Sequence, residues 1–370
     1  MKMFNPYRDG FPGFALLCSR FKNSSMQYFE GSAITHIAVH KVGNQSEDEY
    51  LTLSKKELAV DPEVKELMTR YFLNPFKSEE YFQFYAEGHI SSNEAWNYVS
   101  AIFEKPEQTL AQSKNLAQHL YNQGTHPSIK GGEFYVVYFK EGLLNGETVD
   151  AIGLFKSENK EPFLKVFPVE DAFEVESEEG ININKLDKGC MIFNTDKENG
   201  YIISVVDTKN KSPEARYWTD SFLRIQQRQD QYFNTESTMA LYKSYVVDHL
   251  PEQYNVTKAD QADLLNRSLS FFKEKQHFDQ ETFNNEVLHH KEYVESFDRY
   301  KQHYSAERDI EIADNFSISP AAVKRQNRAY KSVIKLDKNF HIYIHGDRNM
   351  IEHGEDDKGR FYKLYFHNEE

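Results

Sequence analysis

The hydrophobic and polar positions of this chain change period along its length, and these changes predict its elements. In the first half, apolar runs rich in Ile, Val and Phe are separated by turn residues, which is typical of β-strands. The runs are Ile34–Lys41, Gly132–Lys140, Val149–Phe155, Phe163–Phe167, Cys190–Asn194 and Tyr201–Asp207. Short connections such as Leu144-Asn145-Gly146 favour antiparallel neighbours. The side chains expected inside this sheet are Ile152, Leu154, Val166, Ile192 and Val205.

Three helices are expected beside the sheet. Asp61 caps the first, with Pro62 in its first turn, and Asn93 or Ser92 caps the second. The third begins near Pro106. Apolar residues recur at helical spacing in all three, so we expect each helix to bury one face. The first half is therefore predicted to be α+β, with helices packed on an antiparallel sheet.

From Tyr217 onward the period becomes helical. The first stripe is expected to contain Trp218, Phe222, Ile225 and Phe233. Thr257 and Asp260 resemble a capping box at a later helix. The chain ends with a helix that starts at Ser319-Pro320 and with strand-like runs at Ser332–Leu336, Phe340–His345 and Phe361–Phe366.

At 370 residues the chain is long enough for about two domains. We expect an α+β domain at 26–215 and a helical domain with a small C-terminal β element at 216–370. We expect Met26 to be the natural start, and residues 1–25 to be a non-native or poorly packed extension. The apolar run in that extension is too short for a membrane helix.

Several blocks occur in an order known from one family. They are ITHIAVHKVGN (34–44), HPSIKGGEFYVVYF (126–139), FKSENK (155–160), GININKLDKGC (180–190), NGYIISVVDTKNKSPEARYW (199–218) and SVIKLDKNFHIYIHG (332–346). From about Met26 to the C-terminus, the chain resembles the bacterial nucleoid-associated protein family of the NdpA type. The resemblance implies a cytoplasmic protein located at the nucleoid. It implies where in the cell the protein is found, and not which reaction or binding chemistry it carries out.

The net charge is −14, which argues against a globally basic nucleic-acid binder and against an anionic membrane surface as partner. A local basic patch remains compatible with this charge, because salt screens acids beyond about 10 Å. The two cysteines, Cys18 and Cys190, make no disulfide framework and fit a reducing cytosol.

The densest basic window lies between Pro320 and Lys338, where Asp337 is the only acid. Its six basic residues are Lys324, Arg325, Arg328, Lys331, Lys335 and Lys338. Lys324, Arg328 and Lys331 are expected on one helix face, at i, i+4 and i+7. Such a face can neutralise phosphates without reading sequence, or it can simply be solvated and pair with acids of the protein itself.

A second cluster consists of Lys156, Lys160, Lys185 and Lys188, in expected loops beside Gly, Asn or Ser. Backbone amides of such loops can also meet a phosphate. Ordinary turn chemistry explains the same residues. An acidic run, Glu170–Glu179, separates the two lysine-bearing segments.

One pattern loosely resembles a metal-dependent nuclease: Asp150, then Glu158-Asn159-Lys160, with Glu133 upstream. Carboxylates would hold Mg²⁺ and the lysine would steady a water. The eight-residue step from Asp150 to Glu158 is short for this purpose, and no phosphate-loop, dinucleotide or hydrolase motif occurs. We therefore expect no enzymatic activity, no cofactor and no metal.

These observations predict a nucleoid-associated protein that binds double-stranded DNA through a local basic surface. An acidic module that binds a DNA-handling protein is the first alternative, and a nuclease-like enzyme the second. The sequence does not decide whether DNA contact is direct, or whether the chain forms a homo-oligomer.

Overall fold

The computed structural model describes residues 33–144, 146–207, 216–330, 333–344 and 348–368. The chain divides into two compact units, Met1–Gln226 and Gln227–Glu370. Both mix helices with antiparallel strands, so the predicted α+β class is confirmed. Met1–Ser25, expected to be an extension, lies outside the described residues.

The first unit is built on a seven-stranded sheet in the order β1-β3-β4-β7-β8-β2-β9. Its paired strands run antiparallel, as the short connections predicted. The strands are β1 (Ala33–Val42), β2 (Phe82–Phe84), β3 (Gly132–Leu144), β4 (Glu147–Ser157), β7 (Lys188–Phe193), β8 (Ile202–Asp207) and β9 (Ile225–Gln227).

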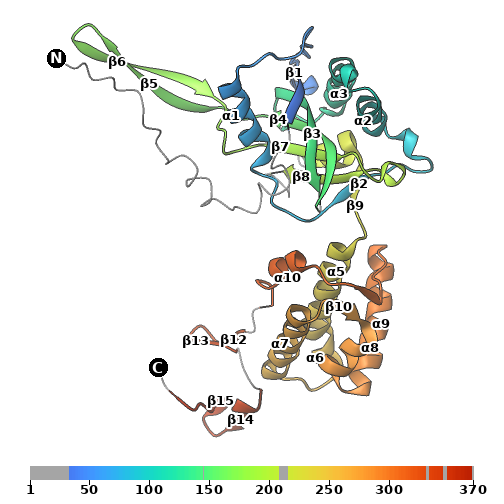
Figure 1. Cartoon of the computed structure of the whole chain (residues 1–370). Coiled ribbons are helices and arrows are strands. Elements are labelled where there is room, and N and C mark those ends of the chain that lie inside the picture. The colour runs from blue at the N-terminus through green and yellow to red at the C-terminus, as the bar shows by residue number, and fades with distance from the viewer. Residues whose placement is uncertain (1–32, 145, 208–215, 331–332, 345–347, 369–370) are drawn as a thin grey trace, which may run out of the picture. The chain divides into compact units, whose positions relative to one another are not determined.

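Both faces of the sheet are covered, so its central strands read as nearly continuous apolar runs. On one face, α2 (Glu94–Glu104) and α3 (Thr109–Gln123) form a core with residues such as Val136 and Ile192. On the other, α1 (Pro62–Leu73) packs its buried Phe72 against Phe155, with ring centres 4.3 Å apart. Figure 1 shows α1 on one side of the strands and α2 with α3 on the other.

The predicted caps are confirmed. Asp61 accepts a hydrogen bond from the Val64 amide at the start of α1, and Asn93 accepts one from the Trp96 amide at the start of α2. These side chains satisfy amides that a helix leaves without an internal partner. The cap residues therefore fix where the two helices begin.

The interior positions predicted for the sheet are confirmed for Ile152, Leu154 and Ile192, and Val205 is half-buried. The prediction for Val166 is wrong, because this side chain is 60% exposed. It lies in β5 (Glu161–Val169), which pairs only with β6 (Ala172–Gly180) in a separate hairpin. The acidic run Glu170–Glu179, which was not among the predicted strands, lies largely in β6.

The segment from Tyr217 departs from the predicted helical stripe. Residues Tyr217–Leu223 form a π-helical segment, η6, and Arg224 ends it with a φ of 51°. Trp218 and Phe222 then join the core of the first unit, together with Ile225 of β9. The boundary between the units therefore falls later than residue 215, because these apolar side chains complete the core on the α2–α3 face.

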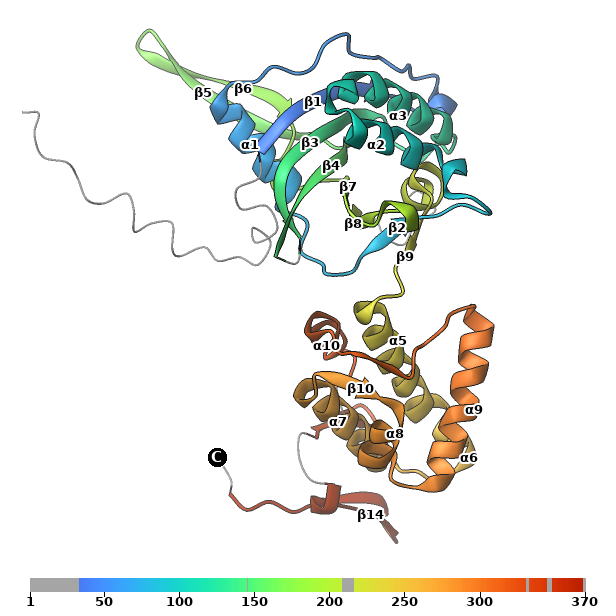
Figure 2. The same cartoon turned by 45° about the vertical axis from the view of Figure 1, so that its right-hand side comes forward.

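The second unit is helical around an aromatic core. Its helices are α5 (Gln231–Ser244), α6 (Leu250–Gln253), α7 (Lys258–Glu274), α8 (Gln280–Phe283), α9 (Lys291–Arg308) and α10 (Pro320–Gln326). Two π-helical segments, η7 (Tyr245–His249) and η8 (Asn284–Leu288), continue α5 and α8. The predicted capping box at Thr257 and Asp260 is confirmed at the start of α7. Figure 2 shows α5, α7 and α9 as the long helices of this unit.

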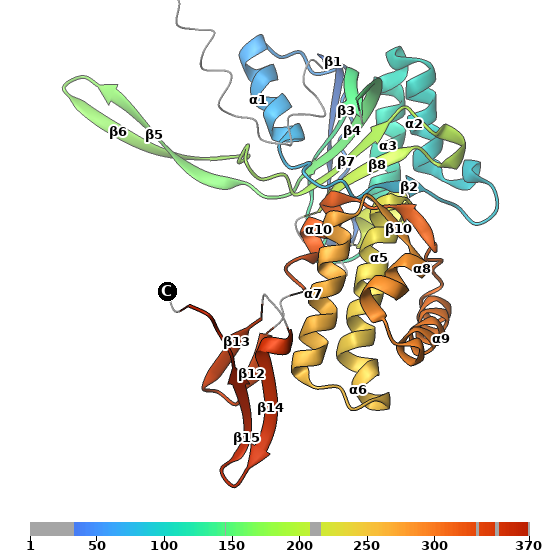
Figure 3. The ribbon, with the colours of Figure 1, turned by 60° about the horizontal axis from the view of Figure 1, so that its bottom comes forward.

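Small β elements complete the second unit. They are β10 (His277–Asp279) with β11 (Asn315–Ser317), β12 (Val333–Leu336) with β13 (Phe340–Tyr343), and β14 (Ile351–Asp356) with β15 (Gly359–Leu364). The strand β14 was not among the predicted runs, because its exposed glutamates give it no apolar signature. Ile334 and Ile351 from two of these hairpins form a small core with Ala259 and Ala262 of α7. Figure 3 shows the two C-terminal hairpins.

Candidate nucleic-acid interface

The helix α10 holds the first basic side chains of the C-terminal window. Ser319 caps it by accepting a hydrogen bond from the Ala322 amide, and Pro320 occupies its first turn, as predicted. Ala322 and Val323 are buried, and α10 packs against α5 and α7. The same helical turn leaves Lys324 and Arg325 exposed.

The expected i, i+4, i+7 helical face is not formed, because α10 ends at Gln326. Arg328 follows in a turn, in which the amides of Ala329 and Tyr330 donate to the Gln326 carbonyl. Burial of Tyr330 anchors that turn, and Arg328 is exposed. Lys331 lies outside the described residues.

The two basic residues of α10 differ in their partners. Arg325 donates to the Tyr232 hydroxyl at 2.9 Å and lies 3.5 Å from the Glu236 carboxylate. Within the described residues, neither Lys324 nor Arg328 forms an ion pair. Their charges are therefore available to an external anion, whereas the charge of Arg325 is partly neutralised.

A surface groove beside Lys324 adds a basic residue that the sequence window did not include. The groove has a volume of about 490 Å³. Its lining includes Lys273 and Lys275 from the end of α7, together with apolar Val323 and Ile318. Lys275 pairs with Glu286 at 2.8 Å, whereas Lys273 has no ion pair among the described residues. The sequence alone could not identify Lys273 as a neighbour of Lys324, because only the packing of α7 against α10 brings the two residues together.

The last two residues of the window lie on a separate element. Lys335 belongs to β12 and Lys338 to the turn before β13, and both are exposed. The window predicted from sequence is thus divided between α10 with its following turn and the β12–β13 hairpin.

Two members of the second lysine cluster are interior residues. Lys156 and Lys188 are each 1% exposed, where loop lysines were expected. The Lys156 amine donates to the Tyr217 hydroxyl at 2.9 Å and to the Lys130 carbonyl at 2.6 Å, and it lies 3.2 Å from the Glu158 carboxylate. The Lys188 amine lies 3.1 Å from the Asp207 carboxylate.

The charges within this cluster compensate one another. Burial lowers the pKa of the Lys156 amine, and the Glu158 charge opposes that change. Burial also raises the pKa of the Tyr217 hydroxyl, as does the neighbouring Glu158 carboxylate. Each lysine has its own acid, so the cluster presents no surplus charge to a phosphate. Lys156 and Lys188 are therefore not part of the interface that we propose.

The other two lysines of that cluster are exposed but paired. Lys160 lies 2.8 Å from Glu133, and Lys185 lies 2.5 Å from Glu161. Exposed pairs of this kind are weak and can open. Each has an acid beside it, which reduces its attraction for a phosphate.

The residues of the nuclease-like pattern do not lie close together in the structure. Asp150 lies near the start of β4 and accepts hydrogen bonds from the Tyr138 hydroxyl and the Glu141 amide. Glu158 follows the other end of the same strand, about 26 Å away at 3.3 Å per residue. Two carboxylates at that separation cannot hold one metal ion.

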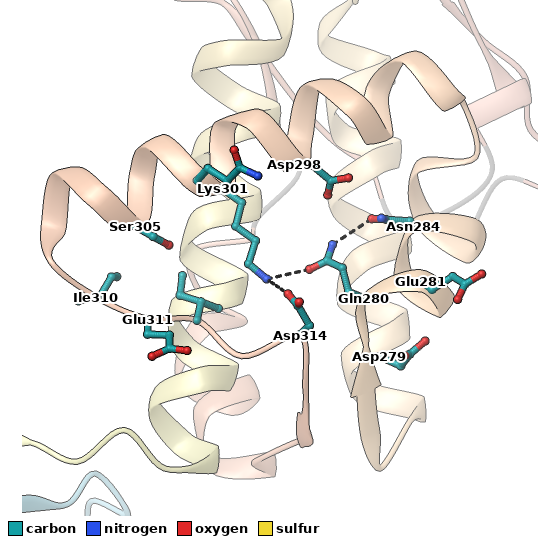
Figure 4. Close-up of a pocket in the computed structure, with 12 residues that line it drawn as sticks. Asp279, Gln280, Glu281, Asn284, Asp298, Lys301, Ser305, Ile310, Glu311 and Asp314 are labelled. Atoms are coloured by element: carbon teal, nitrogen blue, oxygen red, sulfur yellow. Dashed lines mark hydrogen bonds and ion pairs between the residues drawn. The ribbon is translucent and has the colours of Figure 1, made fainter.

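Another groove of the second unit is acidic. It has a volume of about 700 Å³ and is lined by α8, α9 and the segment before β11. Figure 4 shows Lys301 reaching across it to Asp314, at 2.6 Å, and to Gln280, at 3.1 Å. No group of three potential metal ligands occurs in the part of the chain that the structure describes. The remaining acids of this groove, including Asp298 and Glu311, would repel a phosphate.

None of the described helices is long and apolar enough to cross a membrane. In a comparison with protein families, the family described as nucleoid-associated protein YejK matches residues 38–359. This is the family that the sequence blocks resemble. A comparison with curated proteins found no match.

Proposed function

This chain belongs to the nucleoid-associated protein YejK family, and from that premise we propose that it binds duplex DNA directly in the cytoplasm. The proposed contact is the α10 basic surface, which consists of Lys273, Lys324 and Arg328. Lys335 and Lys338 would extend it.

The observation that carries this proposal is that three exposed basic side chains have no ion pair among the described residues, although Glu274 lines the same groove. Lys273, Lys324 and Arg328 are exposed and make no ion pair within the described residues, in a chain whose net charge is −14. Each of these charges can displace a counterion from DNA, and two of them, Lys273 and Lys324, line one groove. The surface offers no base-reading element shaped for the major groove, because α10 is only seven residues long. We therefore expect binding that depends on charge and not on base sequence.

The test is a titration of a fluorescent duplex at several salt concentrations. Each phosphate contact contributes about −0.9 to the slope of log affinity against log salt. The variant K273A/K324A/R328A should therefore flatten the slope by about 2–3 units and weaken unrelated duplexes alike. The control K55A/K56A/K77A removes the same charge from exposed lysines of the first unit and should keep the wild-type slope.

Two outcomes would contradict the proposal. An unchanged slope in K273A/K324A/R328A would move any DNA contact away from the α10 basic surface. A wild-type protein without salt-dependent retention on DNA would mean that it reaches the nucleoid through a DNA-handling partner protein.

A further inference from the structure

The β5–β6 hairpin presents an apolar face that nothing in its unit covers. All residues of β5 and β6 are exposed or half-exposed. On this face, Leu164 is 71% exposed, Val166 60%, Phe173 74% and Val175 59%. None of the four belongs to a hydrophobic core of the described residues. Figure 3 shows the hairpin projecting from the seven-stranded sheet.

The register leaves the central part of one face of the hairpin uncharged. Val166 pairs with Val175, and Pro168 pairs with Phe173, on the apolar face. Because side chains alternate along a strand, the next pair, Lys165 with Glu176, lies on the opposite face. That opposite face also contains Glu174 and Glu178, whose cross-strand partners are Phe167 and Phe163. The central hairpin thus has one uncharged apolar face and one face that carries its charges among aromatic side chains.

Such a hairpin is not expected to stand alone. An isolated two-stranded hairpin is marginally stable in water, and contiguous exposed apolar area marks an interaction site. The acids of 161–180 outnumber its single Lys165, which excludes DNA as the partner of this arm. A partner must cover the apolar face without contacting the acidic one.

We propose that this face packs against the same face of a second copy of the chain. The central part of the face, from Leu164 and Ser177 to Pro168 and Phe173, is uncharged, so two copies can meet there without opposing like charges. Two sheets pack about 10 Å apart, which would place the two acidic faces on the outside, roughly 20 Å from one another. That distance exceeds the Debye length of about 8 Å at physiological salt, so their repulsion is screened. A twofold contact of one patch with itself is the commonest form of homodimer.

The size of the apolar face determines how strong a dimer we expect. Five positions, from Leu164 to Pro168, at about 3.4 Å each and over a width of about 10 Å, give roughly 170 Å² from each copy. A standard interface uses about 800 Å² from each partner. The hairpin contact should therefore give a weak dimer that dissociates on dilution. Pro162 and Pro168 in β5 cannot donate hydrogen bonds, which disfavours edge-to-edge pairing along that strand as the alternative contact.

Sedimentation of the full chain between about 1 and 300 µM tests the proposal, with the duplex omitted. The wild type should shift toward a dimer as concentration rises, and 500 mM salt should not weaken the shift. V166E/V175E should remain monomeric at all concentrations. The matched control K165E changes the net charge by the same amount on the acidic face and should dimerise like the wild type.

Disulfide cross-linking locates the contact without depending on the stability of the glutamate variant. Val166→Cys should form an intermolecular disulfide under mild oxidation, and Lys165→Cys should form much less. A wild type that is monomeric throughout the range would overturn the proposal and leave the face to a different protein. Equal dimerisation of V166E/V175E and wild type, or equal cross-linking at both positions, would overturn it as well.

Discussion

Lys156 of β4 and Lys188 of β7 are cross-strand partners, and the amine of each lies 5.3 Å from the centre of the Tyr217 ring. Two buried ammonium groups on neighbouring strands would repel one another without compensation. Glu158 and Asp207 supply one carboxylate each, and the Tyr217 ring supplies its negative face to both lysines. The cluster joins η6 to the end of the sheet, so it links the last segment of the first unit to its central strands.

Removing one member of this cluster should cost much more stability than removing a surface lysine. Lys156→Met keeps the volume but leaves Glu158, whose side chain is 3% exposed, without its cation. Breaking a buried pair on one side typically costs about 3–5 kcal/mol. Urea unfolding at pH 7 should show that loss, whereas Lys160→Ala, which removes an exposed pair, should cost less than about 1 kcal/mol.

A second variant keeps that prediction interpretable. Glu158→Gln added to Lys156→Met removes the unpaired charge and should recover part of the lost stability. If Lys156→Met unfolds at the wild-type urea midpoint, the cluster contributes no net stability.

The centre of the sheet should respond to truncation as a packed core does. Ile192 lies in β7, is fully buried and contributes to the core on the α2–α3 face. Ile192→Ala should cost about 2–5 kcal/mol in urea unfolding, because it leaves a cavity between sheet and helices. Val166→Ala, measured below 1 µM so that the chain is monomeric, is the matched control and should cost less than about 0.5 kcal/mol, the usual range of a surface change.

The difference between Ile192 and Val166 shows how far the sequence could predict the structure. Both lie in apolar runs, and periodicity reports that a face is apolar, not what covers it. The covered strands, the helix caps and the antiparallel pairing could be predicted because their signals are local. The exposed hairpin could not, because its register with the acidic run appears only in the fold.

The basic residues illustrate the same limit. Exposure and pairing of a lysine depend on neighbours that are distant in sequence, such as Tyr217 for Lys156 and Asp207 for Lys188. The Pro320–Lys338 window could be found as a charge excess. Its division after Gln326, and the arrival of Lys273 beside Lys324, depend on tertiary packing.

Acid should destabilise the first unit through His40. This side chain is 2% exposed, accepts a hydrogen bond from the Ser54 amide at Nδ1 and contacts the Ser113 hydroxyl at 2.8 Å through Nε2. Burial, assisted by the Lys114 charge, lowers the pKa of His40 from 6.5 to about 4. The unfolded chain therefore binds more protons between pH 4 and 6.5, and the free energy of unfolding should fall as the pH is lowered through that window.

The loss of unfolding free energy should approach about 3 kcal/mol at pH 4, because a tenfold change in proton affinity between the folded and unfolded chain corresponds to about 1.36 kcal/mol. Urea unfolding at pH 7, 6, 5 and 4 measures it. His40→Gln should lower stability at pH 7 and weaken the pH dependence, whereas the exposed His303→Gln should leave the wild-type slope. A His40→Gln profile parallel to that of the wild type would show that His40 does not cause the acid sensitivity.

Two neighbouring residues of α10 offer the sharpest test of how DNA is bound. Lys324 has no ion pair among the described residues, whereas Arg325 is held by Glu236 and by the Tyr232 hydroxyl. If free charges make the phosphate contacts, Lys324→Ala should flatten the slope of log affinity against log salt by about 0.9. Arg325→Ala should change that slope by much less, because its charge is already partly compensated. Equal changes in both variants would mean that the Arg325 pair opens on binding and that the folded arrangement of charges does not select the contacts.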